Sequence, residues 1–294
     1  MTWWQFSLRC PAAELDQVEA LLQDLGALSI SLADARDDPI YEPLPGNMPV
    51  WPESIVTGTF DAALDPERLQ QDIRLALPEN LAASLRQDRL QEQDWEHAYR
   101  QHFRPLKCAP GLWILPSWCD PPDPGATLVR LDPGMAFGTG WHATTAMCLS
   151  WLAEQSLAGS EFIDYGCGSG ILAIAACKLG AQRIRAVDID PQALSACAEN
   201  LRVNRVEPER VDLCAPADLE DTPADLLVAN ILAGPLIELA PRFTALVKPG
   251  GQIFLSGILK SQVNGIQSAY RSGFALDSPC YRDDWVGLGG TRAR

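Results

Sequence analysis

The amino-acid sequence predicts an α/β protein with two domains, a small α+β domain followed by a larger one built on a parallel sheet. Three observations lead to this prediction. The chain has 294 residues, about twice the length of a typical domain. Apolar residues make up 47% of it, which is enough to bury a core. From residue 160 onward, short apolar strands alternate with helical segments, as in βαβ units.

The first third of the chain predicts the smaller domain. Apolar alternation predicts strands at 4–8, 28–32 and 54–60, with a fourth near 85–92, and helices are expected to begin at Pro11 and Asp65. Strand, helix, strand, strand, helix, strand is the ferredoxin-like order. We therefore expect residues 1–92 to form a ferredoxin-like domain.

Residues 93–130 are expected to join the two domains. A helix is predicted over 93–107, and short strands over 112–115 and 127–131. The Pro-rich and Asp-rich stretch 119–125 between these strands is typical of a turn.

Residues 131–294 predict the larger domain. The expected strands lie at 162–164, 184–187, 211–214, 226–229 and 252–256, and the expected helices at 171–179, from Pro191, and at 235–247. Alternation at this spacing predicts a parallel, doubly wound sheet.

Composition excludes several classes of protein. The nine cysteines are odd in number and contain no Cys-x-x-Cys pair, which argues against a disulfide framework and a zinc module. Three histidines without ligand spacing give a metal site no support. No apolar run reaches the length of a membrane span, and the N-terminus lacks the pattern of a secretory signal. We expect a cytoplasmic protein with reduced thiols.

Negative charge is concentrated at the start of the chain. The formal net charge is −15, and residues 1–96 carry 18 acidic and 6 basic side chains. Such a surface repels phosphate backbones and attracts basic partners, so direct binding of nucleic acid is disfavoured. A solvated acidic surface without a partner would give the same pattern.

A glycine-rich loop is the strongest local signal. It spans Gly166-Cys-Gly168-Ser-Gly170, follows an apolar strand that ends near Asp164, and opens a helix. Glycines let the backbone approach a ligand closely. A dinucleotide site prefers a third glycine where this chain has Ile171, so the spacing favours another nucleoside cofactor over NAD.

Two polar residues follow strands of the predicted sheet. Asp188 ends the strand after the glycine loop, where a carboxylate can accept hydrogen bonds from both ribose hydroxyls. Asn230 follows the fourth strand, in the sequence Asn-Ile-Leu-Ala. The glycine loop resembles the first motif of the class I S-adenosylmethionine-dependent methyltransferases. Many members that modify amides or nucleobases carry Asn-Pro-Pro-Tyr or Asp-Pro-Pro-Tyr after the fourth strand, so the departure counts against a planar amide or base amine as acceptor. A simple turn role for Asn230 remains open.

The loop and Asp188 together resemble the class I S-adenosylmethionine-dependent methyltransferases. A longer stretch, Leu131-Asp-Pro-Gly-Met-Ala-Phe137-Gly-Thr-Gly-Trp-His142-Ala-Thr-Thr145, closely resembles the signature of the PrmA family of ribosomal protein L-eleven (L11) methyltransferases. Further similar motifs span nearly the whole chain, including Asp37-Asp-Pro-Ile-Tyr and Trp285-Val-Gly-Leu. The resemblance implies a substrate-binding domain at 1–92, followed along the chain by a Rossmann-like catalytic domain at 131–294.

The resemblance also implies the site and the substrate. Thr145, Gly166, Asp188 and Asn230 would contact S-adenosylmethionine, with Gly168 and Gly170 shaping the loop. Phe137 and His142 would close over the site, and His142 and Asn230 are candidates for lining it near the reacting atoms. The implied acceptors are lysine ε-amines and the N-terminal α-amine of L11. No metal is implied, and a monomer is expected.

Three other functions stay open at this stage. The chain could methylate a small amine or another protein, it could be a NAD-dependent oxidoreductase, or it could be a binding module without catalysis. The position of Ile171 argues against the oxidoreductase, and the intact loop with Asp188 and Asn230 argues against the binding module. For His142, a packing role and a functional role are equally open.

Overall fold

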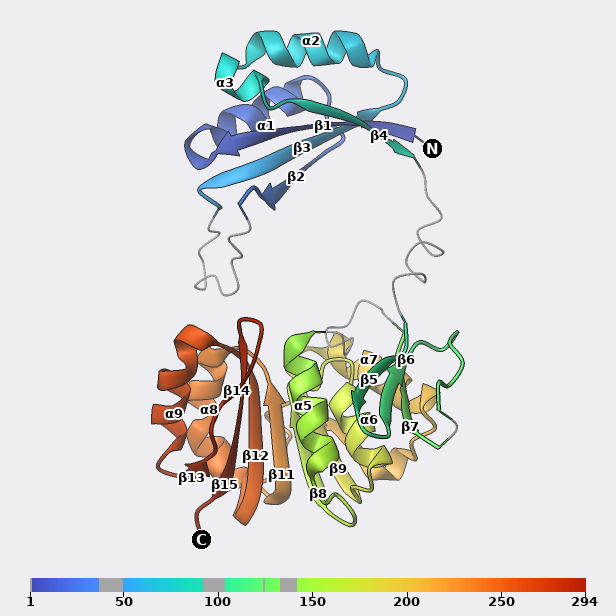
Figure 1. Cartoon of the computed structure of the whole chain (residues 1–294), viewed down its shortest axis with the longest axis vertical. Helices are drawn as coiled ribbons and strands as arrows, with labels where there is room; N and C mark the ends of the chain where they lie inside the picture. The colour runs from blue at the N-terminus through green and yellow to red at the C-terminus, as the bar shows by residue number, and fades with distance from the viewer. Residues whose placement is uncertain (1, 37–49, 92–103, 124, 133–141) are drawn as a thin grey trace. The chain divides into compact units, whose positions relative to one another are not determined.

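The computed structural model describes residues 2–36, 50–91, 104–123, 125–132 and 142–294 (Figure 1). The chain divides into two compact units, Met1–Arg100 and Gln101–Arg294.

The first unit is a four-stranded antiparallel sheet with helices packed on it (Figure 1). Its elements are β1 (Thr2–Pro11), the 3₁₀ turn Ala12–Glu14, α1 (Leu15–Asp24), β2 (Ser29–Asp34), β3 (Glu53–Asp61), α2 (Pro66–Ala76), α3 (Glu79–Ala82) and β4 (Arg86–Gln91). The strand order β2-β3-β1-β4 confirms the ferredoxin-like prediction. The four-residue α3 was not predicted, because it is too short to show helical periodicity.

One face of this sheet holds the core of the first unit. Phe6 and Phe60 lie on paired strands, both fully buried, with their rings edge to face at 5.7 Å. Leu22 of α1 and Ile73 of α2 pack into the same cluster. The side chain of Asp65 caps α2 by accepting a hydrogen bond from the backbone of Glu67 at 3.0 Å, as its position before a proline predicts.

The second unit begins with a three-stranded sheet, β5 (Leu106–Ala109), β6 (Leu112–Leu115) and β7 (Thr127–Arg130). The helix expected over 93–107 lies mostly outside the described residues. Its expected last turn is wrong, because Leu106 and Lys107 belong to β5 and pair antiparallel with Ile114 and Trp113. Pairing with a neighbouring strand overrides local propensity here.

The main sheet has the strand order β10-β9-β8-β11-β12-β15-β13, and β14 pairs with β15. Its strands are β8 (Glu161–Tyr165), β9 (Arg183–Val187), β10 (Val211–Cys214), β11 (Ala224–Asn230), β12 (Val247–Leu259), β13 (Phe274–Leu276), β14 (Cys280–Arg282) and β15 (Trp285–Arg292). The five predicted strands are present and parallel to one another. The sheet continues beyond these five strands with β15, which was not predicted and runs antiparallel to both β12 and β13. Glycines at 287, 289 and 290 conceal this strand in the sequence.

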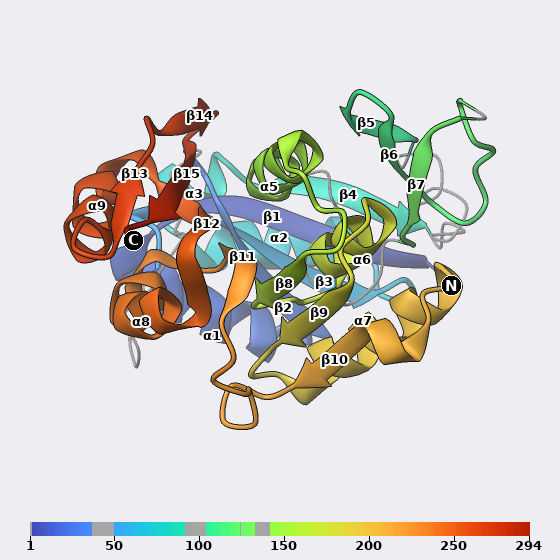
Figure 2. The same ribbon diagram turned by 90° about the horizontal axis from the view of Figure 1, so that it is seen from below.

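Helices cover both faces of the main sheet (Figure 2). They are α5 (Ala143–Glu154), α6 (Ile171–Lys178) and α7 (Pro191–Val203) on one face, and α8 (Ala233–Leu246) and α9 (Val263–Tyr270) on the other. Successive residues of a strand point to opposite faces of the sheet. Phe162 packs in the cluster with α5, α6 and α7, and Ile163 packs in the cluster with α8 and α9. This layering confirms the Rossmann-like class.

All nine cysteines lie in the described part of the chain, and none of them is joined to another by a disulfide bond. No helix in that part combines the length and the apolar character needed to cross a membrane.

Candidate active site

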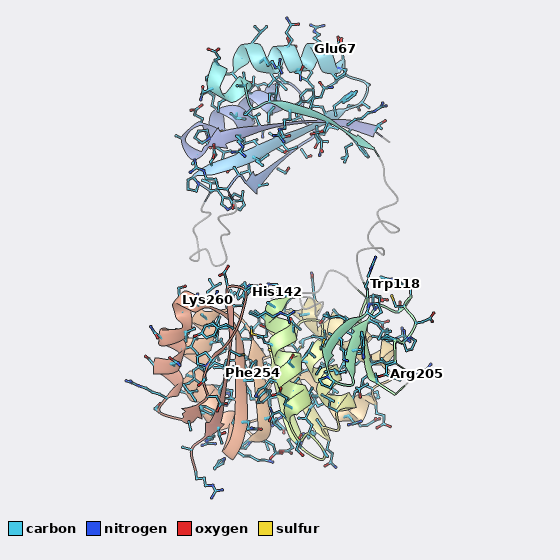
Figure 3. All side chains as sticks on the ribbon, in the orientation of Figure 1. Glu67, Trp118, His142, Arg205, Phe254 and Lys260 are labelled. Carbon is cyan, nitrogen blue, oxygen red and sulfur yellow. The ribbon has the colours of Figure 1, made fainter. Side chains whose placement is uncertain are left out.

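The predicted polar residues meet at one edge of the main sheet. Gly166 follows the last residue of β8, Asp188 follows the last residue of β9, and Asn230 ends β11. These strands are parallel neighbours, so their carboxyl ends share an edge, where open α/β sheets bind ligands. Figure 3 places His142 at the same end of the unit as Lys260, which directly follows β12, whereas Phe254 lies midway along the sheet.

The glycine loop wraps over the end of β9. The backbone amides of Gly166 and Cys167 donate to the carbonyl oxygen of Val187 at 2.7 and 3.0 Å. Gly166, Gly168 and Gly170 all have left-handed φ angles, of 80°, 51° and 77°. Residues with a Cβ rarely adopt this conformation, which is why the loop consists of alternating glycines. Gly170 then caps the amino end of α6.

Asp188 ties the two ends of this loop region together. Its Oδ2 accepts a hydrogen bond from the Gly168 amide at 2.9 Å, and its Oδ1 accepts one from the Asp190 amide at 3.0 Å. The carboxylate is half-buried. Each oxygen keeps a further lone pair, so the group can still accept hydroxyl hydrogens from a ligand.

Asp164 lies beneath the loop as a fully buried carboxyl group. Its Oδ2 accepts a hydrogen bond from the amide of Ala173 at 3.0 Å, while its Oδ1 has no hydrogen-bond partner among the described residues. Burial raises the pKa of Asp164 to about 7, the negative charge of Asp188 adds to the rise, and the Ala173 hydrogen bond opposes it.

Thr145 and Asn230 come from different elements and touch each other. The Asn230 Nδ2 donates a hydrogen bond to the Thr145 Oγ1 at 3.3 Å. Thr145 lies in the first turn of α5 and is only 1% exposed. The contact therefore joins the start of α5 to the end of β11, and the structure brings these two predicted residues together.

His142 is the N-terminal cap of α5. Its Nδ1 lies 2.8 Å from the Thr144 Oγ1 and accepts a hydrogen bond from the Thr144 amide at 3.4 Å. Its ring meets the Trp285 ring edge to face, with centroids 5.0 Å apart. Burial lowers the pKa of His142 below its ordinary value, and the charge of Asp283 partly offsets this. The imidazole is therefore mainly neutral at pH 7.

A cavity of about 320 Å³ opens beside these residues. Its lining is mostly apolar and consists of His142, Thr144, Asn230, Ile231, Leu232, Gly257 and Trp285. It adjoins the glycine loop through Ile231, whose side chain packs against Gly166. A small apolar chamber with a few polar groups is typical of a small-molecule or side-chain site.

Several lining residues were not predicted as part of the site. Trp285 was noticed only as a family motif, and Gly257 not at all. A signal for Gly257 does exist, since a glycine at the carboxyl end of a buried strand can mark a close approach of backbone. Phe137, which was expected to close over the site, lies outside the described residues. Within the described ranges, no three His, Cys, Asp or Glu side chains are grouped so that they could hold a metal ion.

Known proteins are similar to this chain over nearly its whole length. The sequence profile described as "Ribosomal protein L11 methyltransferase (PrmA)" matches residues 2–293. The ribosomal protein L11 methyltransferase of Marinobacter nauticus is 47% identical over 295 residues, which cover 99% of each chain. That of Azotobacter vinelandii is 46% identical over 296 residues, covering 99% of this chain and all of the other.

A solved structure is similar as well. The crystal structure of ribosomal protein L11 methylase from Lactobacillus delbrueckii subsp. bulgaricus superposes with a TM-score of 0.59 at 34% identity. The match covers 65% of this chain and all of the other. The resemblance drawn from the sequence motifs is therefore confirmed.

Proposed function

Because the chain belongs to the ribosomal protein L11 methyltransferase (PrmA) family, we propose that it methylates lysine ε-amines and the N-terminal α-amine of L11. The methyl donor is S-adenosylmethionine. The observation that carries the proposal is the meeting of the glycine loop, Asp188 and Asn230 beside an apolar cavity at one sheet edge.

The residues at this edge fit a nucleoside donor. At Gly166 and Gly168 the loop carries no side chain, so a ligand's amino-acid part can approach the backbone there. Asp188 keeps free lone pairs for two ribose hydroxyls. Asn230 lines the cavity, and its amide donates a hydrogen bond to Thr145. We assign cofactor contacts to Thr145, Gly166, Gly168, Asp188 and Asn230.

Bound S-adenosylmethionine supplies a methyl carbon that its positive sulfur activates for displacement. The remaining task of the chain is to align an acceptor nitrogen and to keep that nitrogen unprotonated. A lysine amine has an ordinary pKa of about 10.4 and is mostly charged at neutral pH. The apolar wall of Leu232 and Trp285 disfavours the charged form, so the proton leaves to water as the amine enters.

This account makes positioning and desolvation the main contributions. Asn230 orients the acceptor at the edge of the cavity, where its amide is held by Thr145. His142 holds the start of α5 and borders the cavity as a neutral ring. No side chain has to act as an indispensable general base.

We infer that residues 1–92 bind the protein substrate, residues 93–130 link, and residues 131–294 catalyse. Residues 1–96 carry 18 acidic and 6 basic side chains. Ribosomal proteins are generally basic, so this charge would steer L11 toward the first unit. The same charge disfavours direct contact with nucleic acid. We expect a monomer that works in the cytoplasm, where L11 is made.

A labelling experiment tests the substrate. Tritiated S-adenosylmethionine is incubated with the protein and with ribosomal proteins from a strain that lacks the enzyme. We expect a labelled L11 band, with label at lysines and at the N-terminus by mass spectrometry. Label on another band, or on a small amine alone, would contradict the proposal. A nicotinamide-dependent absorbance change would point to the oxidoreductase instead.

A further inference from the structure

Ile231, the residue after Asn230, lies between Gly166, which follows β8, and Gly257, which lies in β12. A Cβ built on Gly166 would lie 2.2 Å from the Ile231 Cγ2. A Cβ built on Gly257 would lie 2.3 Å from the Ile231 carbonyl oxygen and 2.9 Å from its carbonyl carbon. Carbon atoms in ordinary contact stay about 3.5–4.0 Å apart, so a methyl group fits at neither position.

The strands β8 and β12 lie on either side of β11. Gly166 follows β8, and Gly257 lies in β12 directly after Ser256, which pairs with Asn230. The segment Asn230–Leu232 therefore leaves the sheet between two positions without side chains. One of these positions belongs to the cofactor loop, and the other lines the cavity.

The two contacts differ in kind. At Gly166, the neighbour is the side chain of Ile231, which can be shortened by mutation. At Gly257, the neighbour is the backbone of Ile231, which moves only if the whole segment moves. A side chain at 257 would therefore push Asn230 and Leu232 away from β12. Displacements of about 1 Å can lower the rate of a positioned reaction by about 100-fold.

We propose that Gly257 is a positioning residue for methyl transfer. Because it has no side chain, the segment Asn230–Leu232 closes onto β12, and Ile231 then seats against Gly166. The distance between the cofactor loop and the acceptor cavity is fixed in this way. The inference rests on the proposed function of the same site, and it adds a residue that acts through the segment Asn230–Leu232.

The test compares two glycines of the same strand. Gly257 has a φ of 82° and Gly250 a φ of 79°, but a Cβ on Gly250 would meet nothing within 4 Å. Gly257→Ala and Gly250→Ala thus carry the same backbone strain, and only Gly257→Ala adds the collision with Ile231. Gly250 lies near the opposite end of β12, beside Asp225 and Lys248.

We expect Gly257→Ala to lower kcat for L11 methylation, measured at saturating S-adenosylmethionine, by about 30-fold or more, a loss much larger than any rise in the calorimetric Kd for the cofactor. Gly250→Ala should keep the wild-type kcat. If kcat of Gly257→Ala stays close to wild type, or falls only in proportion to cofactor affinity, the positioning role is refuted. If the wild-type protein does not label L11, the proposed function itself fails, which is a separate result.

A second pair of variants applies if Gly257→Ala does not fold. Ile231→Val keeps Cγ2, the atom that contacts Gly166, whereas Ile231→Ala removes it. We expect Ile231→Ala to lower kcat by about 10-fold with unchanged cofactor affinity. Ile231→Val should keep a kcat close to that of the wild type. Equal kcat in both variants would overturn the proposal.

Discussion

The backbone amide of Gly168 donates a hydrogen bond of 2.9 Å to the Oδ2 of Asp188. One carboxylate thereby joins the middle of the glycine loop to the end of β9. The same group is the proposed acceptor for the ribose hydroxyls of the cofactor. Loss of this side chain should therefore disturb binding in two ways, by removing ligand contacts and by releasing the loop.

Asp188→Ala is expected to weaken S-adenosylmethionine binding in calorimetry by on the order of 10- to 100-fold, since hydrogen bonds to charged groups contribute about 1.5–3 kcal/mol. Unchanged affinity would refute the ribose assignment. Asp190→Ala is the matched control, because it removes the same charge two residues away. Asp190 caps α7 through the Gln192 amide at 2.8 Å, so its loss should lower stability by about 1 kcal/mol without affecting binding.

The contact between Asn230 and Thr145 predicts a second outcome. Thr145→Val keeps the side-chain shape and removes the hydroxyl that accepts from the Asn230 Nδ2. The unpaired amide costs about 1–3 kcal/mol, so we expect kcat/KM to fall by about 10-fold. Thr145→Ser retains the hydroxyl and should remain close to wild type in steady-state assays. Equal activity of the two variants would mean that the contact does not orient Asn230.

His142 separates a positional mechanism from one with a general base. His142→Ala should lower the melting temperature, because loss of a helix cap costs about 1 kcal/mol, and methyl transfer should persist. His142→Asn keeps a capping side chain and should recover the stability. If both variants lost transfer while binding the cofactor normally, the imidazole would be essential and the positional mechanism wrong.

The lowered pKa of His142 also predicts a pH dependence. Below pH 6.5, the unfolded state takes up a proton more readily than the folded state, so the free energy of unfolding falls as the pH falls from 6.5 through the folded pKa. His142→Asn should lack this contribution. Denaturant melts of both proteins at pH 5 and pH 7 measure the difference, and identical pH profiles would contradict it.

Asp164 predicts the opposite dependence. Its pKa rises from the ordinary 3.8 to about 7 in the folded protein, so the folded state binds more protons between these values. Its contribution to stability is complete below pH 3.8 and is lost as the pH rises through 7. Raising the pH from 5 to 7.5 should therefore remove about 2–3 kcal/mol from the wild type relative to Asp164→Asn. Parallel profiles of the two proteins in denaturant melts would show that Asp164 is already ionised at pH 5.

The first five strands of the main sheet could be predicted from the sequence, because each of them is a short apolar run next to a clear helix signal. The glycine loop could be predicted as well. Three of its five residues have left-handed φ angles, a conformation that favours glycine, so the loop is visible in the sequence. The strand β15 did not appear in the prediction. Its glycines give no alternation, and it exists as a strand because β12, β13 and β14 pair with it.

The candidate site divides in the same way. Asp188 and Asn230 could be predicted from their places after apolar strands, since a parallel sheet puts such residues at one edge. Trp285 could not be predicted as a site residue in this way. It lies in β15, and it lines the cavity only because the antiparallel edge of the sheet brings β15 beside α5.

By itself, the sequence determined the local geometry: where the backbone turns left-handed, where helices are capped, and which carboxylate follows which strand. These properties depend on a few neighbouring residues. Only the tertiary structure decided that Ile231 is held between Gly166 and Gly257, because that contact joins the residues that follow β8 and β11 to a residue of β12. A glycine required by a distant backbone is indistinguishable in the sequence from one required by its own turn, since the collision that excludes a side chain arises only when the sheet is formed.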